Sequence, residues 1–248
     1  MSRALASEFL KMRTTRTFFG LVLAAVGLTL LISIVFAAAE SFSGREHPGL
    51  DVIAGSGFGQ IFGLVLGVLA VTTEFRHGTI TPSLLAVPDR TRLVLAKLGA
   101  GLAVGLALGV LCVGLGSLAG LGILSVRGVP TLTGAGEIAG AIAGGVVSAM
   151  LFCGIGVGLG AIIRNQVGAI IGVILWVLLV EPLLGTVPGI GDAVTDYGLG
   201  GASNALTKTG GDGGAALGQV PGGLLMAGYC VLFAVLGIVT MRRRDISA

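Results

Sequence analysis

The chain has 248 residues, of which 54% are hydrophobic and only 11% are charged, and its mean hydropathy is +1.02. Because a soluble domain carries about 25% charged residues, this composition excludes an ordinary soluble protein and indicates an integral membrane protein. The formal net charge of +3 does not predict a nucleic-acid partner, since the basic residues cluster at the ends of apolar runs, where they report topology.

Only helices and closed barrels satisfy their backbone hydrogen bonds in lipid. The apolar runs are continuous and about 20 residues or longer, which is typical of helices and not of alternating barrel strands. The predicted fold class is therefore an all-α membrane protein with six transmembrane helices. In chain order the spans are Thr17–Ala39, Val52–Thr73, one within Leu98–Val126, one within Ile138–Ile163, Gln166–Pro188 with an interruption near Glu181 and Pro182, and Val220–Met241.

The distribution of basic residues predicts the orientation. If the N-terminus is cytoplasmic, the outer loops hold only Arg45, Arg127 and Lys208, and all other Lys and Arg residues fall on the inner side. The positive-inside rule then places both termini in the cytoplasm, with a basic tail at 242–248, and we expect a multi-pass protein of the plasma membrane. A signal peptide ending at Ala37–Ala39 is the alternative for the first run, which is longer than the usual 7–15 residues of such regions.

The N-terminal segment, residues 1–16, precedes the first span. Leu5, Phe9 and Met12 fall on one helical face, which predicts an amphipathic helix lying in the membrane interface. Lys11 and Arg13 are then expected to meet lipid phosphates or water. The alternative is a plain topogenic charge cluster.

Many of the 45 glycines recur at four-residue spacing. Small residues at this spacing share one helix face and let backbones approach closely. The faces serve either packing within one subunit, or an interface with a second copy or a surface that slides during transport. They comprise Gly101, Gly105 and Gly109; Gly116 and Gly120; Gly140 and Gly144; Gly154 and Gly158; and Gly168 and Gly172.

A polar, basic segment, residues 73–92, separates the second and third spans. Thr81 is a good N-cap, Pro82 a good first helical residue and Pro88 a stop, which together predict a short helix near 79–88. Asp89 is placed to cap the helix of the third span. On the residues alone, the segment is either an ordinary loop or a rigid knob that a cytoplasmic partner contacts.

Charge inside the predicted spans is nearly absent. Glu181 follows Arg164 by about 25 Å of helix, so we expect it near the outer interface, as a solvated end residue or as an outer-gate residue facing the path. Gln60 is a buried amide that needs a partner, either substrate or a neighbouring helix.

The chain lacks the Gly-x-x-x-x-Gly-Lys-Ser/Thr loop that cradles nucleotide phosphates, and we find no catalytic or metal-ligating constellation. His77 beside Glu74 is interpreted as a surface residue. Cys112, Cys153 and Cys230 lie singly inside apolar runs. No catalytic activity and no cofactor are therefore expected on this chain.

The segment between spans two and three resembles that of permeases of the type-2 exporter family of ATP-binding-cassette (ABC) transporters. There, an acidic residue after span two is followed by a Gly-Thr pair, a short helix, a proline, a basic residue and then a lysine entering span three. The opening residues 8–13 and the six-span layout are also similar. The matching positions here are Glu74, Gly78, Thr79, Leu84, Leu85, Pro88, Arg90 and Lys97.

The resemblance implies a permease subunit that exports a hydrophobic or amphipathic substrate, such as a lipid-like molecule, a peptide antibiotic or a drug. Its partners would be a second copy or a sister permease and a cytoplasmic ATPase subunit, which holds ATP and Mg. A short re-entrant segment near 187–219 would line the outer gate. The alternative function is an ion-coupled secondary transporter or channel. The residues expected to couple to the ATPase are Glu74, Arg76, His77, Gly78, Thr79, Leu84, Leu85, Pro88 and Arg90, and the possible path or gate residues are Gln60 and Glu181.

Overall fold

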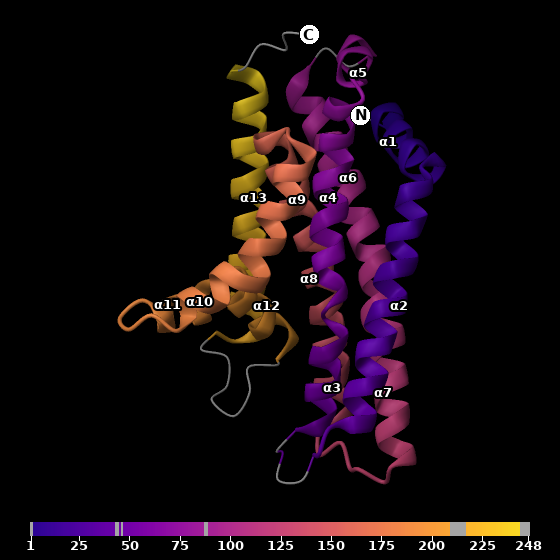
Figure 1. Ribbon diagram of the computed structural model, residues 1–248, viewed down its shortest axis with the longest axis vertical. Helices are drawn as coiled ribbons and strands as arrows, with labels where there is room; N and C mark the ends of the chain where they lie inside the picture. The colour runs from indigo at the N-terminus through magenta and orange to yellow at the C-terminus, as the bar shows by residue number, and fades with distance from the viewer. Residues whose placement is uncertain (1, 43–44, 46, 87–88, 209–216, 244–248) are drawn as a thin grey trace.

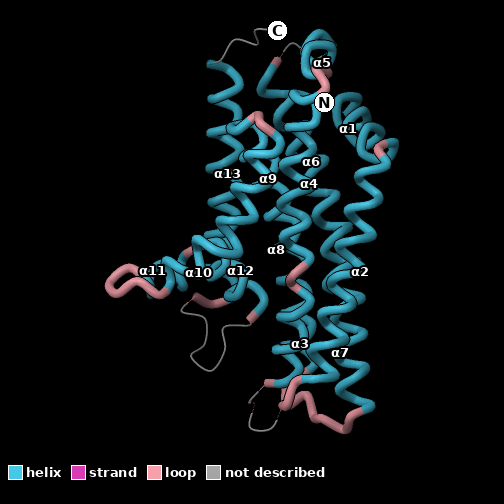
Figure 2. Tube along the Cα trace, in the orientation of Figure 1, coloured by secondary structure: helices cyan, strands magenta, loops and turns pink. Residues whose placement is uncertain are grey.

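The computed structural model describes residues 2–42, 45, 47–86, 89–208 and 217–243, and these residues form helices and loops without a strand. Figures 1 and 2 show an elongated bundle. Six helical segments in the described part are long and apolar enough to cross a membrane, which confirms the predicted fold class. They are Thr17–Ala39, Pro48–Arg76, Arg90–Val126, Ala135–Ile163, Gln166–Gly185 and Gln219–Arg243.

The individual elements follow the apolar runs closely, with short helices between them. In order they are α1 (Ser2–Thr14), α2 (Arg16–Ala39), α3 (Pro48–Ser56), α4 (Gly59–Arg76), α5 (Ile80–Ala86), α6 (Arg90–Gly109), the π-helical turn η1 (Val110–Gly114), α7 (Leu115–Val126), α8 (Ala135–Ile163), α9 (Gln166–Leu175), the π-helical turn η2 (Trp176–Val180), α10 (Glu181–Gly185), α11 (Gly191–Tyr197), α12 (Leu199–Thr207) and α13 (Gln219–Arg243).

Helix α8 is the centre of the bundle and packs against α4, α6 and α13. Its glycines permit this approach: a Cβ at Gly156 would overlap the backbone oxygen of Leu64, and one at Gly158 would lie 2.5 Å from the backbone of Phe233. Gly105 on α6 meets α8 in the same way. These faces serve packing inside the subunit. By contrast, Gly172 on α9 has nothing within 4 Å.

Three spans are less regular than the sequence indicated. The second predicted span is divided at Gly57 and Phe58, between α3 and α4. The third contains the π-helical turn η1, and the fifth contains η2 immediately before Glu181 and Pro182. A proline cannot donate a backbone hydrogen bond, and a π-helical turn lets the helix continue around that missing donor. The helix therefore continues to Gly185 and ends there, not at Pro188 as predicted.

The segment after α10 is largely helical in its described part. Helices α10, α11 and α12 lie to one side of the bundle, between the two ends of its long axis (Figure 1). Helix α12 packs on α8 and α13. The predicted outer or re-entrant segment near 187–219 thus contains two short helices, and residues 209–216 lie outside the described part.

Helices α1 and α5 and the C-terminal end of α13 lie at one end of the molecule, and the loop between α7 and α8 lies at the other (Figure 1). Because the number of spans is even, α1 and the C-terminal end of α13 lie at the same end of the molecule. The distribution of basic residues predicts that the end with α1 and α5 faces the cytoplasm.

Candidate functional site

The polar segment begins where α4 ends. Gly78 has a φ of +66°, in the left-handed region that only glycine adopts without strain. The N–H of Gly78 donates to the carbonyl of Phe75 at 3.4 Å, and the N–H of Thr79 donates to that of Glu74 at 2.9 Å. This pair of bonds is a Schellman motif, and it turns the chain sharply from α4 into α5.

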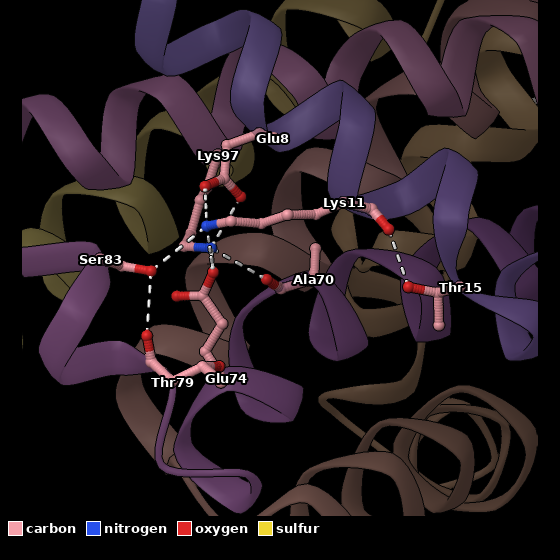
Figure 3. Close-up of polar contacts among 8 residues, drawn as sticks. All are labelled: Glu8, Lys11, Thr15, Ala70, Glu74, Thr79, Ser83 and Lys97. Atoms are coloured by element: carbon pink, nitrogen blue, oxygen red, sulfur yellow. Dashed lines mark hydrogen bonds and ion pairs between the residues drawn. The ribbon is translucent and has the colours of Figure 1, made fainter. Parts of the chain in front are cut away.

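Next to this turn, four charged side chains from three helices form a charge cluster, Glu8, Lys11, Glu74 and Lys97 (Figure 3). The ammonium of Lys97 lies 2.8 Å from Glu8 Oε2 and 2.8 Å from Glu74 Oε1. The ammonium of Lys11 lies 2.8 Å from Glu8 Oε1 and 2.8 Å from the same oxygen of Glu74. Two carboxylates thus alternate with two ammonium groups, and the cluster is electrically neutral.

Further hydrogen bonds tie the charge cluster to its surroundings. Lys97 donates to the carbonyl of Ala70 on α4 at 3.2 Å, and Lys11 donates to Ser83 Oγ on α5 at 3.2 Å. Ser83 in turn donates to the carbonyl of Thr79. The cluster therefore joins α1, α4, α5 and α6 at one point.

The four residues of the charge cluster differ in how far they are buried. Lys97 is 0% exposed, Glu8 3% and Glu74 6%, whereas the side chain of Lys11 is 46% exposed. Burial lowers the pKa of Lys11, but hydrogen bonds and attraction from Glu74 and Glu8 outweigh it, and its pKa is raised above 10.5. Breaking a buried pair is costly because it leaves a charge uncompensated, so this arrangement favours one position of α1.

Lys11 is held by two protein carboxylates, a contact that was not predicted, and its side chain remains 46% exposed. The expectation that the spans hold almost no charge is corrected, because Lys97 lies within the third span and is fully buried. Glu74 lies inside the charge cluster, where it anchors two lysines.

Helix α5 follows the turn. It spans Ile80–Ala86, inside the predicted range of 79–88, but Thr81 lies within the helix and is not its N-cap as predicted. Ile80 is buried, and Leu85 is 79% exposed. Arg76, His77 and Thr79 are also exposed. The side chain of Leu84 and the whole of Pro88 lie outside the described part of the chain.

Two polar residues fix the start of α6. Asp89 accepts hydrogen bonds from the N–H groups of Thr91 at 2.9 Å and Arg92 at 3.3 Å, which confirms the predicted cap. Arg90 donates to the carbonyl of Met241 at 2.7 Å, so its guanidinium binds the end of α13, where carbonyls lack helical partners. Arg90 therefore holds two spans together.

A cavity of about 460 Å³ adjoins the charge cluster. Its walls come from α1, α2, α4 and the turn that follows it, α6, α8 and the start of α9. Polar residues line one part, and apolar side chains of α2, α4 and α6 line the remainder. The lining residues used below are Lys11, Phe18, Leu21, Leu66, Leu69, Arg76, His77 and Val104.

Gln60 forms a second, smaller polar cluster away from α5. Its side-chain oxygen accepts hydrogen bonds from Ser148 on α8 at 3.0 Å and from Ser203 on α12 at 2.7 Å. The two hydroxyls are 2.9 Å apart. Of the two partners expected for this amide, the structure provides a neighbouring helix, and it joins α12 to α4 and α8.

Glu181 at the start of α10 is 8% exposed. The expectation of a solvated end residue is therefore wrong. Its Oε1 accepts a hydrogen bond from the N–H of Gly200 at 2.6 Å, and Oε2 is buried with no hydrogen-bond partner among the described residues.

No known family model and no curated protein matches this chain. The site must therefore be interpreted from its own geometry. Sequence reasoning missed the roles of Glu8 and Lys97; the spacing of Glu8 and Lys11, three residues apart on one amphipathic helix, was a usable signal for their ion pair only. Among the described residues, no group of three or more His, Cys, Asp or Glu side chains is arranged to hold a metal.

Proposed function

We propose that this chain is the membrane-spanning permease subunit of an ABC exporter, in which a separate subunit hydrolyses ATP. The observation that carries the proposal is the charge cluster. It binds α5, the short helix at the surface, to the interfacial helix α1 and to the ends of the spans α4 and α6. A load applied to α5 is thereby transmitted to three other helices.

The exposed surface around α5 suits a protein partner. Leu85 presents a large apolar side chain to solvent, and apolar anchors surrounded by polar groups are typical of binding hot spots. Exposed Arg76, His77 and Thr79 supply that polar surround. The proposed partner is a cytoplasmic ABC ATPase subunit, which would hold ATP and Mg.

A second permease subunit, identical or related, completes the proposed transporter. Helix α9 offers a surface for such contacts, because Val167, Ile171 and Leu175 are 61%, 52% and 47% exposed and Gly172 is uncovered. The proposed cargo is hydrophobic or amphipathic, and the proposed location is the plasma membrane with both termini cytoplasmic.

The test is copurification of ATPase activity with the tagged full-length chain in mild detergent. Leu85→Asp should abolish the copurifying activity, because a charge replaces the apolar anchor. Leu132→Asp is the matched control: this leucine is also exposed, at 61%, but lies in the loop at the opposite end. ATPase recovery that is equal in both variants would refute docking at α5, and no ATPase with the wild type would refute the permease assignment.

The alternative of an ion-coupled transporter or channel draws on Glu181. Ionisable residues at membrane depth are typical of proton and ion pathways, and this carboxyl is buried with one oxygen unpartnered among the described residues. Transport in vesicles driven by a proton gradient without ATP, and lost in Glu181→Gln, would favour this alternative. Transport that requires ATP and proceeds without any ion gradient would eliminate it.

A further inference from the structure

We propose that the cavity beside the charge cluster binds an anionic phospholipid of the adjoining membrane leaflet, with the phosphate at the polar rim and one acyl chain inside. The proposal does not depend on the transport function. It follows from the shape, lining and charge of the cavity.

The volume of the cavity, about 460 Å³, is within the range of roughly 300–1,000 Å³ that is usual for ligand sites. The apolar part of its lining comes from three spans, with Phe18 and Leu21 from α2, Leu66 and Leu69 from α4, and Val104 from α6. These side chains offer hydrocarbon contacts and few hydrogen bonds. A hydrocarbon chain is the ligand that such a surface accommodates.

The rim has the opposite character. Glu8 and Glu74 line it, but both are more than nine-tenths buried and are held by lysines. The exposed charged and titratable groups at the rim are therefore Lys11, Arg76 and His77. A rim with this bias attracts an anionic group, and a phosphate accepts hydrogen bonds from guanidinium and imidazole donors.

The location of the cavity favours a lipid over a soluble amphiphile. The cavity lies beside α2, on which Phe19 and Leu23 are 52% and 73% exposed, as expected for side chains that face lipid. Basic pockets between spans near the cytoplasmic surface are suited to anionic lipid headgroups. In the orientation predicted from the charges, the rim lies at that surface.

The experiment reconstitutes the full-length protein in phosphatidylcholine vesicles that contain phosphatidylglycerol, extracts it in mild detergent and measures how much of each lipid stays bound. The wild type should retain phosphatidylglycerol selectively. Arg76→Gln should weaken this retention about fivefold, since one basic residue near the surface contributes about 1 kcal/mol to anionic lipid binding, and adding His77→Gln should weaken it further. Arg243→Gln, an exposed arginine outside the cavity, should leave retention unchanged.

A second pair of variants tests the apolar part. Leu21→Trp should fill the cavity and reduce selective retention to the level of bulk lipid, and Val104→Phe should do the same from α6. Leu23→Trp lies on the same helix but outside the cavity lining and should behave like the wild type. Only variants that elute as monodisperse protein are compared.

Several results would overturn the proposal. Equal retention of the two lipids would show a non-selective lipid shell. An equal loss in Arg243→Gln and Arg76→Gln would show diffuse charge attraction. Selective retention that survives both cavity-filling variants would place the lipid elsewhere. The same experiment is repeated with oleate added to the vesicles. Binding of oleate without retention of phosphatidylglycerol would show that the occupant is a free anionic amphiphile and not a phospholipid.

Discussion

Replacement of Lys97 by methionine should destabilise the protein more than the same replacement of Lys11, the other lysine of the charge cluster. Methionine has a similar length but no charge, so the substitution leaves the shape of the site nearly intact. It removes the ammonium that contacts Glu8 and Glu74 at 2.8 Å each and the bond to Ala70 at 3.2 Å. Two buried carboxylates then share the half-exposed Lys11.

The size of the effect follows from burial. Removing one partner from a fully buried ion pair costs about 3–5 kcal/mol, because an uncompensated charge stays in a low-dielectric environment. Lys11 contacts the same two carboxylates, but its side chain is 46% exposed. Water therefore screens it, and Lys11→Met should cost about 1 kcal/mol or less.

The assay is the free energy of unfolding in mixed micelles, measured for Lys97→Met and Lys11→Met. Arg92→Met is the control: its side chain is 72% exposed and pairs with Asp89 at 3.2 Å, so its effect should stay within about 0.5 kcal/mol. Adding Glu8→Gln to Lys97→Met should recover part of the loss, because it removes one uncompensated charge. An equal or larger cost for Lys11→Met would refute the assignment of Lys97 as the centre of the cluster.

Three further predictions concern single positions. The pKa of Lys11 is raised above 10.5 in the folded protein, so its stabilising contribution should be fully present below that pH and lost as the pH rises through the folded-state value. A pH titration of the stability difference between wild type and Lys11→Met measures this, and a difference that disappears near neutral pH would contradict it. Gly78→Ala should cost about 1–2 kcal/mol. This cost is conformational, because φ is +66° and no atom lies within 4 Å of the new Cβ. An unchanged denaturation midpoint would argue against the Schellman turn. Gly156→Ala should destabilise the protein by about 1–3 kcal/mol, because its Cβ would meet the carbonyl of Leu64. Gly172→Ala should not destabilise it, because nothing lies within 4 Å of that Cβ. Equal thermal unfolding of the two variants in detergent would contradict the close packing of α4 and α8.

The sequence by itself determined the class of protein, the number of spans and most of their bounds. In lipid, long uncharged runs can satisfy their backbone hydrogen bonds only as helices, whatever their tertiary contacts. Local chemistry also predicted the cap of α6, because Asp89 binds N–H groups only two and three residues away.

Tertiary structure decided the contacts between segments that are far apart in the chain. Lys97 looked like one more basic residue at the inner membrane surface, yet it is buried because α1 and α4 bring Glu8 and Glu74 to it. Glu181 is buried for the same reason, since the chain folds back and supplies the N–H of Gly200. Helix periodicity records which residues share a face, but the pairing of faces depends on packing between helices, which the order of residues alone does not specify.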